Sequence, residues 1–124
     1  MTYRIADGVD QEANFADVAP QPRCPGILAT RRMYSLNRTV YEDGLYTYWE
    51  YETLDDTTWN SLLSQFGISD STKTNQVTIR TAGNARTFVN KNGTIVYPEI
   101  GVDATRIRSF WKNVRFYIVE LSDT

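Results

Sequence analysis

The side chains that most enzymes use for proton transfer and nucleophilic attack are nearly absent from this sequence. Its 124 residues include no histidine and a single cysteine, Cys24. A Ser-His-Asp triad, a Cys-His pair and a Cys/His zinc site are therefore excluded, and no disulfide can form within the chain. The side chains left for acid–base chemistry are carboxylates, which must work in pairs at a defined separation.

Two carboxylate pairs have a structural explanation. Asp55 and Asp56 come directly before an apolar helical pattern, where acidic residues cap a helix and meet the positive end of its dipole. Asp7 and Asp10 are too few ligands for a calcium loop. Together with the missing histidines, these pairs predict a protein that is not an enzyme and that holds no cofactor and no metal.

A third pair of carboxylates shares one strand face with tyrosines. Glu50 and Glu52 follow Tyr46 and Tyr48 at alternate positions, so all four side chains point the same way if the segment is a strand. This pattern indicates a solvated or interfacial strip. Aromatic rings beside carboxylates also suit carbohydrate, so a carbohydrate-binding surface or a glycosidase that uses carboxylates stays as an alternative.

Arginines alternate with aromatic residues in two stretches, around residues 31–41 and 106–117. Such a pattern could bind single-stranded nucleic acid by stacking, as a small OB-like module does. The chain has 13 Lys+Arg against 15 Asp+Glu, however, and this net charge of −2 argues against duplex DNA binding. Arginine and aromatic residues are also concentrated in protein–protein interfaces. We therefore predict an interface made of these residues: Arg31, Arg32, Tyr34, Tyr46, Tyr48, Arg115 and Tyr117.

Residues 1–26 differ from the rest of the chain. Three of the four prolines lie between positions 20 and 25, and the few apolar residues show no sustained period. Proline removes a backbone donor and disfavours helix in the residue before it. We expect residues 1–26 to form an extended, Pro-rich N-terminal arm without core residues, and residues 27–124 to form a β domain.

The predicted β domain consists of strands with alternating apolar and polar residues. Asp43-Gly44 and Asn92-Gly93 follow such strands and predict hairpin turns. The last strand, over 109–121, is apolar on both faces, as expected of a central strand or of one that meets a partner. The other expected strands cover residues 27–36, 45–52, 76–81, 86–91 and 94–97.

One helix is expected near residues 56–66, because its apolar residues recur at helical spacing and Gly67 can end it. The fold class is therefore mainly β, a small antiparallel β-barrel or sandwich with one short α-helix and an extended N-terminal arm. We expect these residues in the core: Trp49, Trp59, Leu62, Phe66, Phe88, Phe116 and Ile118.

The order of these elements resembles a known group of proteins. The strand WEYETLDD at 49–56 runs into a helix with Leu63-x-x-Phe66, and the chain closes with FWKNVRFYIVEL at 110–121. Over residues 31–121 this resembles small structural proteins of tailed bacteriophages, particularly minor tail and distal-tail-type proteins. The N-terminal arm is not part of the resemblance.

The resemblance implies a virion protein made in the host cytoplasm. Its partners would be copies of itself, commonly in a hexameric ring around the tail lumen, and other virion proteins. A capsid decoration or cement protein shares these traits and stays as an alternative. No membrane association is expected, since no apolar run approaches the roughly 18–20 residues that span a bilayer.

Overall fold

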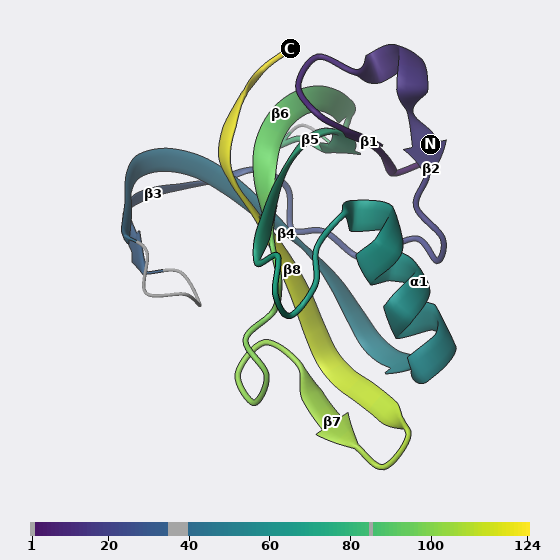
Figure 1. Ribbon diagram of the computed structural model, residues 1–124. Coiled ribbons are helices and arrows are strands. Elements are labelled where there is room, and N and C mark those ends of the chain that lie inside the picture. The colour runs from purple at the N-terminus through teal and green to yellow at the C-terminus, as the bar shows by residue number, and fades with distance from the viewer. Residues whose placement is uncertain (1, 35–39, 85) are drawn as a thin grey trace.

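The computed structural model describes residues 2–34, 40–84 and 86–124, and the side chains of residues 30–34 and 40–43 lie outside the described part. Within these residues the chain forms strands, one 3₁₀ turn and one α-helix (Figure 1). In chain order they are β1 (Arg4–Asp7), η1 (Glu12–Asn14), β2 (Ala16–Asp17), β3 (Leu28–Tyr34), β4 (Val40–Asp55), α1 (Asp56–Phe66), β5 (Thr74–Ala82), β6 (Phe88–Val96), β7 (Thr105–Ile107) and β8 (Phe110–Asp123).

Antiparallel pairing joins the described strands into a sheet with the order β2-β1-β5-β6-β8-β4-β3, and β7 pairs with β8. The mainly β class with one helix is thus confirmed, although β2 and β3 end an open sheet rather than closing a barrel. β8 lies between β6 and β4, which explains why it is apolar on both faces. In the described part of the chain, no helix is long and apolar enough to span a membrane.

Helix α1 begins and ends where its capping residues predict. The Asp55 side chain accepts a hydrogen bond from the backbone N–H of Thr58 at 2.7 Å, which satisfies a donor that the first turn leaves free. Gly67 ends the helix in the left-handed conformation, at φ 73°. The apolar residues that helical spacing places on one face are buried: Trp59, Leu62 and Phe66.

The core is a cluster of buried apolar side chains contributed by helix α1 and several strands. Most residues predicted for it are buried, namely Trp49, Trp59, Leu62, Phe66, Phe116 and Ile118. The prediction is wrong for Phe88, which is half-buried. Phe88 is the first residue of β6, where its ring meets the Tyr3 ring edge-on at 4.9 Å and the Arg80 guanidinium at 5.7 Å.

The N-terminal residues are docked on the domain, so the interpretation of residues 1–26 as an arm without core residues is wrong. β1 pairs with β5 along its whole length, and Ile5 and Val18 lie in the core with 2% and 1% exposure. The Tyr51 hydroxyl donates to the Pro20 carbonyl at 2.6 Å and ties the Pro-rich segment to β4. The sequence pattern missed β1 and β2 because such short strands cannot show a periodicity.

The two dipeptides predicted as hairpin turns, Asp43-Gly44 and Asn92-Gly93, lie inside strands β4 and β6. Both turn predictions are therefore wrong. The β3–β4 connection falls on residues 35–39, which lie outside the described residues. The β5–β6 connection lies between Ala82 and Phe88.

Close packing, rather than a turn, accounts for the Asn92-Gly93 pair. A Cβ added to Gly93 would lie 2.7 Å from Leu121 Cδ2 and 2.9 Å from Ile118 Cγ2. The Asn92 amide donates to Asp10 Oδ1 at 2.8 Å and joins β6 to the loop after β1. The missing side chain at Gly93 thus lets β8 approach β6. Close approach of a neighbouring strand is a common reason for glycine within a strand.

We expect Gly93→Ala to lower the free energy of unfolding by about 2 kcal/mol, because the new methyl group overpacks the contact with β8. Urea denaturation followed by circular dichroism measures this change. In a double-mutant cycle, Leu121→Ala should recover part of the loss, since it removes the nearest clashing atom. Additive effects would contradict the close approach of these two residues.

Candidate functional site

One face of strands β4 and β8 carries aromatic and charged side chains. Trp49 of β4 and Phe116 of β8 both contact Phe66 of helix α1, so these two residues point toward the core. Because side chains alternate along a strand, their neighbours point to the opposite face. We call this set the outer strip, and its members are Tyr46, Tyr48, Glu50, Arg115 and Tyr117.

The rings of the outer strip lie side by side. The Tyr117 centroid is 6.3 Å from that of Tyr46 and 5.5 Å from that of Tyr48. The Arg115 guanidinium lies over the Tyr48 ring at 4.6 Å from its centroid, a favourable cation–π geometry. A hydrogen bond to Tyr117 is the main reason why the pKa of Arg115 is raised. The strip is thus an ordered surface with half-buried rings.

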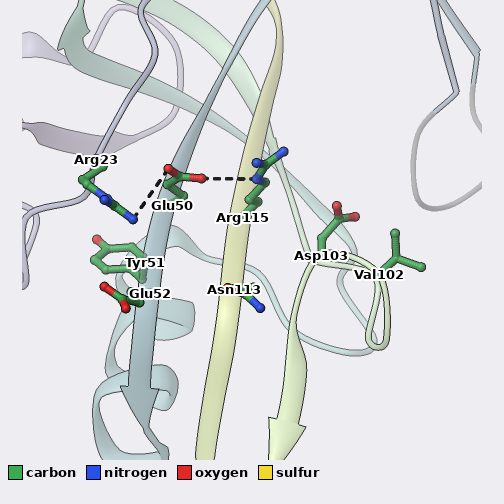
Figure 2. Close-up of a pocket in the computed structure, with 8 residues that line it drawn as sticks. All are labelled: Arg23, Glu50, Tyr51, Glu52, Val102, Asp103, Asn113 and Arg115. Atoms are coloured by element: carbon green, nitrogen blue, oxygen red, sulfur yellow. Dashed lines mark hydrogen bonds and ion pairs between the residues drawn. The ribbon is translucent and has the colours of Figure 1, made fainter.

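Glu50 joins the outer strip to the Pro-rich segment. Its carboxylate accepts a hydrogen bond from Arg115 Nε at 3.2 Å and lies 3.9 Å from Arg23 Nη2 (Figure 2). Backbone hydrogen bonds in both directions between Arg23 and Glu50 hold the segment alongside β4. These exposed ion pairs add little stability by themselves, but they orient the charged end of the strip.

A hollow of about 260 Å³, which we call the strip hollow, lies beside the charged end of the outer strip (Figure 2). Carboxylates and arginines contribute most of its polar groups. Its lining residues are Arg23, Glu50, Tyr51, Glu52, Val102, Asp103, Asn113 and Arg115.

Asp103 is the carboxyl group of this lining whose pKa is strongly raised, whereas burial also raises the pKa of the Tyr51 hydroxyl. The Asp103 side chain is 7% exposed, and its buried Oδ2 has no hydrogen-bond partner in the described residues. Burial, and then the charge of Glu99, raise the pKa of Asp103 to about 6, although Arg115 opposes the shift. A carboxyl group with this pKa suits a general acid, but its buried Oδ2 faces protein rather than a substrate. Sequence reasoning missed Asp103 because only tertiary burial distinguishes it from other aspartates.

The carboxylate pair Asp55-Asp56 has the structural role that the sequence predicts. Asp56 binds both terminal guanidinium nitrogens of Arg106 and accepts from Trp111 Nε1 at 3.1 Å. The hydrogen bond from Thr58 lowers the pKa of Asp55, and that from Arg106 lowers the pKa of Asp56. The pair therefore caps α1 and attaches the β7–β8 hairpin to it.

The carboxylate pair Asp7 and Asp10 makes hydrogen bonds to residues far away in the chain. Asp7 Oδ1 accepts from the Asn75 amide at 2.9 Å, and Asp10 Oδ1 accepts from the Asn92 amide at 2.8 Å. Among the residues that the structure describes, no group of three or more His, Cys, Asp or Glu could hold a metal ion.

The structure brings together the predicted interface residues that it describes with side chains: Tyr46, Tyr48, Arg115 and Tyr117. Arg31, Arg32 and Tyr34 belong to β3, and their side chains lie outside the described part. A row of half-buried rings beside the exposed Arg115 suits contact with another macromolecule. No protein-family model, no curated protein and no solved structure matches this chain.

Proposed function

We propose that this chain is a non-enzymatic structural subunit of a tailed-bacteriophage virion, in the tail, and that it works by making contacts between subunits. The observation that carries the proposal is the outer strip. The sequence selected Tyr48, Arg115 and Tyr117 as interface residues, and the fold places them next to one another at 4.6–5.5 Å. Clustered aromatic and arginine side chains provide much of the binding energy in interfaces.

The β3–β4 hairpin supports an assembly role independently. β4 pairs with β8 from Thr47 onward, whereas residues 40–46 pair with β3 in the described residues. This two-stranded part extends away from the rest of the sheet (Figure 1). A two-stranded ribbon is marginally stable alone, and a strand at the end of a sheet offers unpaired backbone groups to another chain.

The partners in this proposal are copies of the chain, in a ring that is commonly hexameric in the proteins it resembles, and other virion proteins. The tail assignment comes from the resemblance over residues 31–121. A capsid decoration protein is the alternative within the virion. The N-terminal residues do not reach across to a neighbouring subunit as an arm in this proposal, because β1 and Val18 complete the core of their own chain.

Self-association and incorporation into particles test the proposal. We expect purified protein to associate in sedimentation velocity, and mass spectrometry of purified particles to detect it. The variant Tyr46→Ser/Tyr48→Ser should weaken association at least about tenfold, equivalent to roughly 1.4 kcal/mol, by removing two rings of the strip. Tyr46→Phe/Tyr48→Phe keeps the rings and serves as the matched control.

A protein that stays monomeric and is absent from particles would contradict the proposal.

The outer strip also favours a second function, a single-stranded nucleic-acid or carbohydrate binding module. Salt-dependent binding of a labelled oligonucleotide, or binding to a glycan array, would support that module if the serine variant abolishes it.

A further inference from the structure

The tip of the β7–β8 hairpin presents two apolar side chains to solvent. Ile107 and Phe110 are paired across the strands, and they are 48% and 46% exposed. Arg108 and Lys112 flank this pair and make no ion pair with any described residue. The hairpin extends beyond the body of the protein (Figure 1). An exposed apolar pair between free cations is typical of a contact surface.

The structure holds this tip in place. Arg106 binds Asp56 at the start of helix α1 and lies over the Trp111 ring, 5.2 Å from its centroid. Arg108 adopts φ 58°, a conformation that favours glycine or asparagine in a hairpin turn and is costly for arginine. The turn therefore presents the Arg108 side chain at the tip without a backbone reason for arginine at this position.

The loop that follows β1 lies at the opposite end of the molecule from β7 (Figure 1), and it carries acidic residues. Asp7, Asp10 and Glu12 make no ion pair with any described residue, and Val9 between them is 45% exposed. A hollow of about 140 Å³, the end hollow, adjoins this loop. Its lining residues are Val9, Gln76, Asn92, Gly93, Thr94, Glu120 and Ser122.

The side chains without an ion pair in the described residues have opposite charge at the two ends. They are Arg108 and Lys112 at the tip, and Asp7, Asp10 and Glu12 around the loop after β1. Each end also exposes apolar surface, at Ile107 and Phe110 on one side and at Val9 on the other. Complementary charge with apolar contact at the centre is the composition of a specific interface.

We propose that the β7–β8 tip of one copy of this chain docks on the acidic end of the next copy. Phe110 and Ile107 pack on Val9 and the end hollow, and Arg108 and Lys112 meet the carboxylates around it. Because the two surfaces differ, the contact is head-to-tail, and repeated copies close into a ring or continue as a filament. The inference rests on the proposed function and names a contact between copies in that assembly.

Variants at each end test this docking. The tip variant is Arg108→Asn/Phe110→Ser, and the end variant is Asp10→Asn/Glu12→Gln. Asparagine tolerates the positive φ at residues 10 and 108, so these changes remove charge without straining the backbone. We expect each variant alone to associate at least tenfold more weakly than the natural protein in sedimentation velocity, with an unchanged melting temperature. Arg86→Asn removes a cation from another positive-φ position, at φ 59°, and is the matched control.

Mixing the variants separates head-to-tail docking from other modes. The end variant keeps an intact tip and the tip variant keeps an intact acidic end, so an equimolar mixture restores one tip-to-end contact per pair and should associate more tightly than either variant alone. If both variants associate like the natural protein, the docking is wrong and the proposed function stands. If the natural protein is monomeric and absent from particles, both fail. Binding of a monomeric protein to phosphatidylserine vesicles through the tip would overturn the docking in favour of a lipid surface.

Discussion

Replacing Trp59 with alanine should lower the free energy of unfolding by about 3–5 kcal/mol, the range for deleting a large buried aromatic side chain. Trp59 is 4% exposed. Its ring stacks on Trp111 with centroids 4.1 Å apart and planes inclined by 12°, and it meets Phe116 at 5.9 Å. It therefore joins helix α1 to β8 directly. A helix of three turns depends on such packing for its stability.

Guanidinium denaturation followed by far-ultraviolet circular dichroism measures the effect of Trp59→Ala without relying on tryptophan fluorescence. Leu63→Ala, on the same helix but at a partly buried position, is the control and should cost less. A loss below about 1 kcal/mol for Trp59→Ala would contradict the docking of α1 through this ring.

Replacing Asp103 with asparagine should raise the free energy of unfolding by about 3 kcal/mol above pH 7 and leave it unchanged near pH 4. The pKa of Asp103 is raised in the folded protein to about 6, from an ordinary value of 3.8. A proton bound to this group therefore stabilises the fold below pH 4, and that stability is lost as the pH rises through 6. Between these two pKa values, each pH unit changes the free energy of unfolding by about 1.4 kcal/mol.

Denaturation curves between pH 4 and pH 8 check this dependence. Glu52→Gln makes the same carboxyl-to-amide change at an exposed position nearby and should keep the natural pH profile. The carboxylates of Asp55 and Asp56 have lowered pKa values, so they affect stability only at lower pH. If Asp103→Asn is less stable than the natural protein at pH 7.5, the partners of the Asp103 carboxylate outweigh its burial and the prediction is wrong.

Helix α1 could be predicted closely because its signals are local. The Asp55 cap, the apolar spacing from Trp59 to Phe66 and the Gly67 terminus all lie within one segment, and the structure shows each as expected. The alternation in β4 and β8 likewise placed Tyr48, Arg115 and Tyr117 on one strand face each. It did not place those faces together, because strand pairing joins residues far apart in the chain.

The two hairpin-turn predictions were wrong because a dipeptide indicates only the local preference of the backbone. Asn92-Gly93 favours a tight turn by itself, yet the approach of Leu121 and Ile118 gives the same glycine a packing role inside β6. The prediction that residues 1–26 form an arm without core residues was wrong for a related reason. Ile5 and Val18 have no periodic neighbours, and only pairing of β1 with β5 places them in the core.

The sequence by itself determined the mainly β class, the α-helix near residues 56–66, the exclusion of histidine chemistry and of a disulfide within the chain, and the residue types available for contact. Only the tertiary structure decided which of those residues meet. Burial changed the pKa of Asp103, β4–β8 pairing assembled the outer strip, and the path of the chain separated the acidic loop at Val9 from the cationic tip at Phe110. The physical reason is that helix and strand periodicity act over a few residues, whereas burial and charge separation depend on which distant segments pack together.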